Sequence, residues 1–279
     1  MESDRVIAEK SRGLQPVLRL IGLGLLLDGL VSLLSGRSWI IARLLPVQDR
    51  GWLARPLGLA ETVFGLQVLG PVRVPSLYRW FAPVYDPADR LYRRVLHTEA
   101  FSAFDRSLAE RLPYRGSVLD LGCGTGANLE RLVALGLPYG SYTGVDLSPD
   151  MLERARRKFP SLPNIQLRQL DLLADQLPDG PFDLIVSTNV FEHLPQTEPV
   201  VAKALDRLRP GGSALLLFQE DSGLGHTPAL RTIYRWFSAR YVPEAEYRRF
   251  PGVTSVQRFV GRSGAINVLV VLRRPSDAK

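Results

Sequence analysis

Cysteine is almost absent from this chain of 279 residues, since Cys123 is the single one. One thiol can form neither a disulfide framework nor a cluster of thiolate metal ligands, and this favours a reducing compartment. Internal repeats and low-complexity tracts are also missing. The first residues mix acidic and basic side chains, and the apolar run after them lacks a small-residue cleavage site. The start of the chain therefore does not resemble a cleaved signal peptide.

The middle of the chain has no large excess of acidic or of basic residues. The net charge is +7, but the basic surplus lies in residues 1–75 and 226–279, whereas residues 76–225 are slightly acidic. A polyanionic partner would therefore meet the ends of the chain, and anionic lipid fits this layout as well as nucleic acid does. The length allows one domain of about 200 residues plus an extension.

Two apolar runs occupy the N-terminal region. Leu20–Leu34 is interrupted by Asp28, and Pro56–Gly70 is interrupted by Glu61. Each run is slightly shorter than the roughly 20 residues of a membrane-spanning helix, and lipid penalises each acid. We expect residues 1–75 to form a hydrophobic helical hairpin that associates with a membrane. A transmembrane hairpin, a hairpin sunk into one leaflet and a hairpin packed on the rest of the protein all remain open, because basic residues flank both sides.

Downstream, over residues 76–279, apolar strands and helices alternate. Strands are expected at Val118–Leu121, Tyr142–Asp146, Ile165–Leu170, Phe182–Ser187 and Ser213–Phe218, and helices at about Pro87–Leu112, Ala127–Leu135, Asp150–Lys158 and Glu198–Leu208. This alternation predicts an α/β fold with a doubly wound, Rossmann-like sheet. Val253–Val260 and Ala265–Arg273 add a hairpin, so we expect seven mostly parallel strands with the last one antiparallel.

A glycine-rich loop joins the first strand to its helix, within VLDLGCGTGAN at Val118–Asn128. Gly122, Gly124 and Gly126 let the backbone turn sharply and approach a ligand, and the helix that follows offers its N–H groups. Asp146 ends the next strand, where a carboxylate can accept both hydroxyls of a ribose, although a helix cap is the alternative. The ordered strand, loop, helix, strand and acid predict a nucleotide-like cofactor.

The spacing of the third glycine distinguishes two cofactor classes. The dinucleotide pattern is G-x-G-x-x-G, but this loop reads G-x-G-x-G after Asp120, an acid that can receive an amino group. Here the chain resembles the class I S-adenosylmethionine (SAM) dependent methyltransferases, over about Tyr78–Pro275. Further segments resemble motifs of that family: VDLSPDML (Val145–Leu152), LRQLDLLADQLP (Leu167–Pro178), FDLIVSTNVFEHLP (Phe182–Pro195) and LDRLRPGGSALLLF (Leu205–Phe218).

The resemblance implies SAM as the cofactor, no metal, and a set of cofactor-binding residues. Asp120, Gly122 and Gly124 would line the methionine end, and Asp146 and Leu147 would hold the ribose. Asp171 and Leu172 would bracket the adenine, and Asn189 would open the wall beside the sulfonium. Cys123, Gly126 and Met151 are further expected cofactor-binding residues. An exposed strand-end acid is the alternative for Asp171. Cys123 is expected to be a small loop residue rather than a nucleophile, because nothing nearby supplies a base.

Methyl transfer from a sulfonium is an in-line displacement, to which a protein contributes mainly alignment. A base is needed only where the acceptor must lose a proton. His193 follows the fourth strand, and its near-neutral titration suits that role. Glu192 could share or replace it, and a histidine that merely orders the loop is the alternative.

Two aromatic-rich segments bear on the acceptor. Tyr78–Asp86 resembles a segment of quinone-biosynthesis methyltransferases and bacterial phosphatidylethanolamine N-methyltransferases, which would make Tyr85 a cofactor contact. Arg231–Phe250 interleaves aromatic rings with arginines, a mixture that suits a membrane interface, an RNA backbone or an amphipathic surface helix.

The hydrophobic N-terminal region favours lipid over nucleic acid. Thr188–Phe191 also lacks the N-P-P-Y-type tetrapeptide of amino-group DNA methyltransferases. We therefore expect a membrane-associated methyltransferase with its catalytic domain facing the cytoplasm. Its acceptor is expected to be a quinone-type ring or a phospholipid headgroup. A soluble acceptor and a catalytically silent SAM-binding scaffold are the alternatives.

Overall fold

The computed structural model describes Asp86, Arg90 and Arg93 and residues 97–220, 240–261 and 265–276. The chain divides into the units Met1–Leu77 and Tyr78–Lys279, and the second contains all of these residues. The expected hairpin at residues 1–75 lies outside the described residues, so the hairpin and the expected boundary stay predictions. Within the described ranges, no helix is long and apolar enough to cross a membrane.

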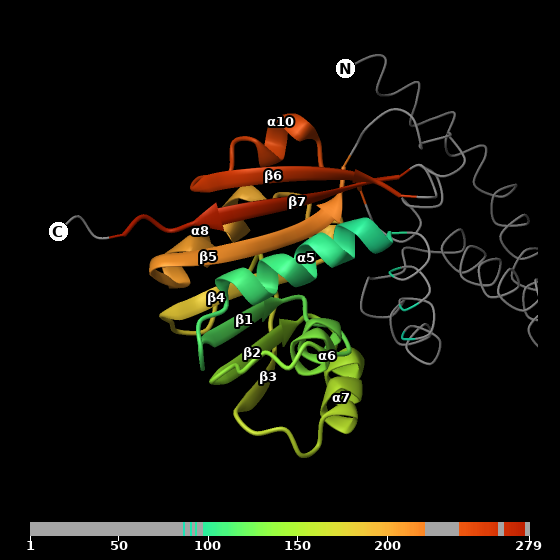
Figure 1. Cartoon of the computed structure of the whole chain (residues 1–279), viewed down its shortest axis with the longest axis vertical. Coiled ribbons are helices and arrows are strands. Elements are labelled where there is room, and N and C mark those ends of the chain that lie inside the picture. The colour runs from blue at the N-terminus through green and yellow to red at the C-terminus, as the bar shows by residue number, and fades with distance from the viewer. Residues whose placement is uncertain are drawn as a thin grey trace, which may run out of the picture. The chain divides into compact units, whose positions relative to one another are not determined.

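Seven strands form one sheet in the order β3-β2-β1-β4-β5-β7-β6 (Figure 1). Their bounds are β1 Ser117–Leu121, β2 Ser141–Asp146, β3 Ile165–Gln169, β4 Phe182–Thr188, β5 Leu208–Gln219, β6 Val253–Val260 and β7 Ile266–Arg273. Strands β1 to β5 pair in parallel, while β7 runs antiparallel to both β5 and β6. The predicted Rossmann-like sheet with an antiparallel last strand is confirmed.

Helices cover both faces of this sheet. Their bounds are α5 Thr98–Arg111, α6 Ala127–Ala134, α7 Pro149–Lys158, α8 Glu198–Arg207 and α10 Glu244–Tyr247, and a short 3₁₀ turn, η2, spans Phe191–His193. Figure 1 shows α5 lying across one face and α8 on the other. Successive side chains of a strand point to opposite faces of the sheet, so Leu215 packs on the α5 side and Leu216 on the α8 side. Both faces are therefore buried, as parallel sheets require.

Helix α5, from Thr98 to Arg111, covers the second part of the helix predicted at about Pro87–Leu112. The first part falls mostly outside the described residues, of which Asp86 and Arg90 are helical. One predicted strand differs in length from the observed one. Strand β5 begins at Leu208 rather than at Ser213, because Leu208 already pairs with Phe182. An irregularity in the register then separates the pairs at Phe182 and Leu184, and Gly211 takes a φ of 77° there. The Pro-Gly-Gly segment is thus part of a bent strand rather than a turn before it.

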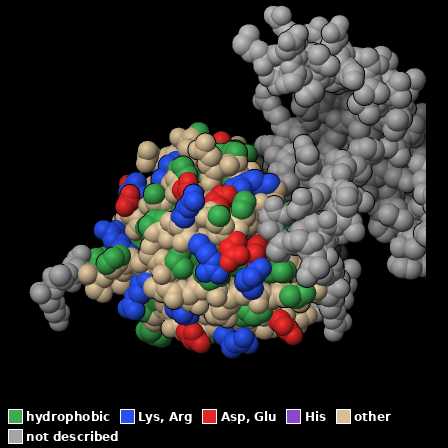
Figure 2. All heavy atoms as spheres, turned by 90° about the horizontal axis from the view of Figure 1, so that it is seen from above, with side chains coloured by type: hydrophobic (Ala, Val, Ile, Leu, Met, Phe, Trp, Pro, Cys, Tyr) green, Lys and Arg blue, Asp and Glu red, His purple; other side chains and the backbone are tan. Residues whose placement is uncertain are grey.

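On the face drawn in Figure 2, acidic and basic side chains of the described residues are interspersed with apolar ones. Ion pairs among the exposed described residues include Arg157 with Glu153 and Arg248 with Glu244. This part of the described surface offers no extended area of one sign, which agrees with the balanced charge of the middle of the chain.

Candidate functional site

The glycine loop leaves β1 at its carboxyl end and is held by the neighbouring strand. The N–H groups of Gly122 and Cys123 both donate to the carbonyl oxygen of Val145, at 2.8 and 2.9 Å. Gly122 has a φ of 70°, and a Cβ there would lie 2.3 Å from a methyl carbon of Val190. Gly124 has a φ of 53°, and a Cβ there would meet nothing within 4 Å. The loop therefore packs tightly at its first glycine and stays open at its second, which leaves room for a ligand.

Asp146 ends β2 and ties this loop to the start of α7. Its Oδ2 accepts from the Gly124 N–H at 2.8 Å, and its Oδ1 accepts from the Ser148 N–H at 2.8 Å. A carboxylate offers about four acceptor positions, so capacity for two ribose hydroxyls remains. Burial raises the pKa of Asp146, and the two N–H groups oppose that rise.

Asp120 lies beneath the loop and is completely buried. Its Oδ1 accepts from Asn128 at 3.0 Å and its Oδ2 from the hydroxyl of Tyr142 at 2.5 Å. Thr188, at the end of β4, donates in turn to Asn128 Oδ1 at 3.3 Å. This network links β1, β2, α6 and β4 at the point where the strands end. The predicted direct contact between Asp120 and the cofactor's amino group stays a prediction, and both oxygens already receive a donor.

The two acids share one electrostatic property. Within the described residues, the hydrogen bonds to Asp120 and Asp146 come only from neutral groups. Burial raises the pKa of Asp120 to about 7, and the charge of Asp146 adds to this rise. A buried acid without a cation is costly to ionise. The arrangement therefore suits a ligand that brings positive charge, such as a sulfonium with an ammonium group.

A pocket opens directly over the glycine loop. Its lining residues are Arg93, Gly122, Cys123, Gly124, Thr125, Ala127, Arg131, Thr188 and Asn189. Asn189 adopts a φ of 56°, and its Oδ1 is buried and accepts no hydrogen bond from any described residue. The guanidinium of Arg131 already pairs with Asp105 at 2.5 Å and lies over the ring of Phe101. The pocket thus presents the guanidinium of Arg93 to a carboxylate and the Asn189 amide oxygen to an ammonium group.

Sequence reasoning missed three residues of this region: Arg93, Thr125 and Asp86. The Thr125 hydroxyl donates to Asp86 Oδ1 at 2.5 Å, which joins the aromatic-rich segment to the loop. Asp86 directly follows Tyr85, the residue that was predicted from that segment and that lies outside the described residues. The sequence did point to two of them, because Asp86 is the last residue of the aromatic-rich segment Tyr78–Asp86 and Thr125 lies within the glycine-rich loop.

The predicted adenine and ribose residues lie along the ends of β2 and β3. Asp171 Oδ1 accepts from the Leu173 N–H at 2.9 Å, so this acid closes a short turn. Leu172 is buried in the core. Leu147 is 40% exposed beside Asp146, whereas Met151 is buried on α7. The adenine and ribose roles of these residues stay predictions, and exposed Leu147 is the one placed to cover a ligand ring.

Cys123 faces the interior rather than the solvent. Its side chain is buried, and a Cβ on Gly144 of β2 would lie 2.8 Å from its sulfur. Burial raises the pKa of the thiol well above its ordinary value, and Asp120 and Asp146 raise it further. The thiol is therefore not activated as a nucleophile.

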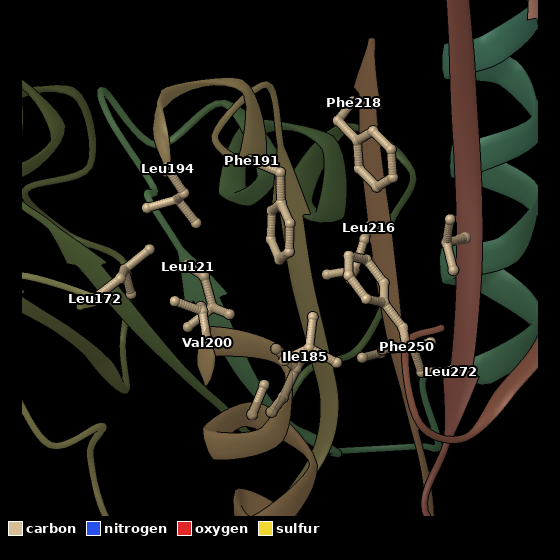
Figure 3. Close-up of a cluster of buried hydrophobic side chains, with 14 of the residues drawn as sticks. Leu121, Leu172, Ile185, Phe191, Leu194, Val200, Leu216, Phe218, Phe250 and Leu272 are labelled. Carbon is tan, nitrogen blue, oxygen red and sulfur yellow. The ribbon is translucent and has the colours of Figure 1, made fainter. Parts of the chain in front are cut away.

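The 3₁₀ turn after β4 is anchored by Phe191. Its ring stacks on Phe218 with centroids 5.8 Å apart and lies 6.1 Å from the ring of Phe250 (Figure 3). This anchor fixes the next two residues, Glu192 and His193. Glu192 is 4% exposed, and its Oε1 accepts from the Gln219 N–H at 2.7 Å. Burial raises the pKa of Glu192 to about 7, which puts its proton exchange near neutral pH.

Ion pairs surround this turn. Arg258 holds Glu220 through two hydrogen bonds of 2.6 and 2.7 Å. Arg240 holds Glu246 in the same way at 2.7 and 2.6 Å, and also donates to the Leu194 carbonyl. Of the three described acids around this turn, Glu192, Glu220 and Glu246, Glu192 is therefore the one without a directly bonded cation.

Comparison with known proteins decides the family. A methyltransferase domain family matches residues 118–212. The phosphatidylethanolamine N-methyltransferase of Cereibacter sphaeroides is 35% identical over 153 residues, which cover 50% of this chain and 71% of that protein. This chain belongs to the class I SAM-dependent methyltransferases. The family uses SAM, and the open glycine, the two acids without a bound cation and the Asn189 oxygen fit that cofactor.

Other relatives are matched over a smaller part of their length. The malonyl-[acyl-carrier protein] O-methyltransferase of Halalkalibacterium halodurans is 33% identical over 49% of this chain and 50% of its own length. The chain thus spans about half or less of several curated relatives that it matches. Among solved structures, a Haemonchus contortus phospholethanolamine N-methyltransferase 2 with bound S-adenosylhomocysteine has a TM-score of 0.55 at 13% identity. It covers 62% of this chain and 53% of its own. A [4+2]-cyclase has a similar score, 0.52, so this likeness concerns the fold alone.

Proposed function

We propose that this protein transfers a methyl group from SAM to a lipid-soluble or membrane-surface acceptor, a phospholipid headgroup or a quinone-type ring. The observation that carries the proposal is the site itself, where two buried acids without a bound cation lie beneath an open glycine loop. The apolar runs Leu20–Leu34 and Pro56–Gly70 support a membrane acceptor, as does the similarity to a phosphatidylethanolamine N-methyltransferase.

The mechanism relies on alignment. SAM supplies an activated methyl group on a positively charged sulfur. Asp146 would hold the ribose, Arg93 would attract the carboxylate, and the Asn189 oxygen would accept from the ammonium group. Buried Asp120 would stabilise the positive charge of the cofactor.

His193 and Glu192 are the candidate bases on that turn. We expect His193→Ala to lower turnover at neutral pH while SAM affinity changes little, because the residue lies beyond the cofactor pocket. Single-turnover rates and calorimetric SAM titration measure both quantities. Unchanged turnover would exclude His193 as the base and leave Glu192.

The direct test of the proposal uses isotope-labelled SAM. The full chain is incubated with membranes that carry candidate acceptors, and the labelled species are extracted and identified. Label in a lipid or quinone fraction supports the proposal, whereas label confined to soluble molecules identifies the N-terminal region as an anchor only. In the same proposal, the catalytic domain faces the cytoplasm, where SAM is available.

A catalytically silent scaffold is the second candidate. The similarity of the fold to that of a [4+2]-cyclase shows that this architecture is not restricted to methyl transfer. SAM binding without label transfer to any extract would favour a scaffold.

A further inference from the structure

Glu192 lies on the 3₁₀ turn that follows the cofactor pocket in the chain. It follows Asn189, which lines the cofactor pocket, by three residues of a tight turn. Three residues span at most about 10 Å, and a 3₁₀ turn is more compact. The side chain is 4% exposed, and its position is fixed by Phe191 in the core and by the Gln219 N–H on Oε1.

The second oxygen of this carboxylate is unused. Glu192 Oε2 is buried and accepts no hydrogen bond from any of the described residues. Buried polar atoms in native proteins are nearly always paired, so each exception calls for a partner. The nearby acids Glu220 and Glu246 each have an arginine. The charge of Arg240 acts on Glu192, but the guanidinium is bonded to Glu246 and the Leu194 carbonyl.

The neighbouring buried amides repeat this pattern. Asn189 Oδ1 and Asn267 Oδ1 are likewise buried and lack a donor within the part of the chain that the structure describes. Asn267 lies directly opposite Gln219 in the β5–β7 ladder, one strand away from the turn. The hydroxyl of Tyr247, which can donate or accept, is also buried without a partner among the described residues. A ligand that satisfies Glu192 Oε2 must bring an N–H or O–H donor, and one that neutralises the carboxylate must bring positive charge.

We propose that the methyl acceptor is an amine, and that Glu192 Oε2 binds its ammonium group and takes one proton from it. The inference rests on the proposed methyl-transfer function and names the atom that receives the methyl group. A reduced quinone brings hydroxyl donors but no positive charge, so it does not neutralise Glu192 as an ammonium group does.

The protons and electrons of this step balance. One proton passes from the ammonium to Glu192 Oε2, which frees the nitrogen lone pair. That pair forms the bond to the methyl carbon while the carbon–sulfur bond breaks, and its electrons stay on sulfur. The methylated ammonium leaves, and Glu192 releases its proton to water. A pKa raised to about 7 by burial lets the carboxyl accept and release a proton near neutral pH.

The groups around Glu192 that can influence its titration come from several elements. They are His193 on the same turn, Arg240 with Glu246 before and within α10, Glu220 with Arg258 on β5 and β6, and His97 before α5. The pKa of His97 is lowered to about 4 by burial, so this side chain is neutral at physiological pH.

The test compares acceptors that differ at one atom. The full chain and labelled SAM are mixed with vesicles of phosphatidylethanolamine, with vesicles of its N-acetylated form, with vesicles that carry a reduced quinone, and with soluble ethanolamine. Label in phosphatidylethanolamine or ethanolamine but not in the N-acetylated lipid supports an amine acceptor. Label in ethanolamine alone supports the amine and overturns the membrane acceptor. Label in the quinone, or in none of the amines, overturns the inference.

Glu192→Gln tests the residue itself. This variant keeps an oxygen for the Gln219 N–H and removes the charge, so the turn should fold. With the amine that accepts label, we expect kcat/KM to fall about 100-fold and the acidic limb of its pH profile, near pH 7, to disappear. SAM affinity should stay within about twofold. The exposed residue Glu244 provides the control, and Glu244→Gln should leave all three quantities unchanged. An unaltered pH profile in Glu192→Gln would overturn the assigned role.

Discussion

The carboxyl ends of β1 and β2 differ from the carboxyl ends of β4 and β5 in how acidic side chains are satisfied. At β1 and β2, Asp120 and Asp146 receive hydrogen bonds from a hydroxyl, an amide and backbone N–H groups. At β4 and β5, Glu220 is bound by the guanidinium of Arg258. Both regions are buried, so burial alone does not distinguish them.

The difference indicates which buried acids depend on a bound ligand for a neighbouring positive charge. An acid that is paired with arginine needs no further cation, whereas a buried acid with neutral donors alone stays costly to ionise. Asp120 and Asp146 belong to the second kind and lie beneath the cofactor pocket. Glu192 is the described acid of the second region that resembles them, and in our proposal it lies on the acceptor side. In the same proposal, ion pairs stabilise the scaffold, and buried acids without a bonded cation belong to the ligand sites.

The largest expected effect comes from filling the cofactor side. Gly124→Ala places a methyl group in the open space over the loop, and we expect SAM affinity to fall about 100-fold. Gly136→Ala is the matched control, because Gly136 also has a positive φ and nothing within 4 Å of its Cβ. Both variants carry about 1–2 kcal/mol of backbone strain. Calorimetry should show equal losses of stability and a loss of binding in Gly124→Ala alone.

A smaller effect is expected from Arg93. If its guanidinium binds the cofactor's carboxylate, Arg93→Ala should weaken SAM binding by roughly tenfold or more. Decarboxylated SAM sharpens the measurement, since the wild-type protein should bind it less tightly than SAM and the variant should bind both alike. Arg90→Ala is the control, because Arg90 pairs with Glu130 outside this pocket. If Arg93→Ala still prefers SAM over decarboxylated SAM as strongly as the wild-type protein does, another group binds the carboxylate.

The ionisation of Asp120 should change the affinity for SAM more than the affinity for S-adenosylhomocysteine, the product that lacks the sulfonium charge. Because the pKa of Asp120 is raised to about 7, the group gains its negative charge as pH rises through that value. The affinity for cationic SAM, relative to S-adenosylhomocysteine, should rise by roughly tenfold between pH 6 and pH 8. Asp120→Asn should flatten this dependence. A ratio that does not change with pH would show that Asp120 does not sense the cofactor's charge.

The smallest effect concerns the scaffold next to the site. Ser148 caps α7, with its side chain accepting from the Met151 N–H. Ser148→Ala should lower the free energy of unfolding by about 1 kcal/mol, as for other caps. Because Asp146 is bonded to the backbone N–H of Ser148, SAM affinity should stay nearly unchanged. Denaturant unfolding and SAM titration measure both.

Much of the fold was predictable because each strand and helix has a local signal. The glycine loop, the strand-end acid Asp146 and the alternation of apolar residues follow from steric and periodic rules that act within a few residues. The early start of β5 at Leu208 was not predictable, since it depends on a distant pairing with Phe182. A proline and two glycines read locally as a turn, but here they form a bent strand.

The sequence suggested residues for the site but could not show their electrostatics. The sequence pointed to Asp120 as a direct ligand of an amino group, while Tyr142 and Asn128 already bind both of its oxygens. That network contains hydrogen bonds between residues 22 and 60 positions apart, so no local pattern reveals it. The same holds for the contact between Thr125 and Asp86, which depends on how the N-terminal part of the domain packs on the loop.

Calorimetric titration of the full chain with SAM at pH 8 tests the central claim most directly. The account predicts one binding site per chain, lost in Gly124→Ala and kept in Gly136→Ala. Absence of binding at high micromolar SAM, or equal binding by both variants, would contradict it.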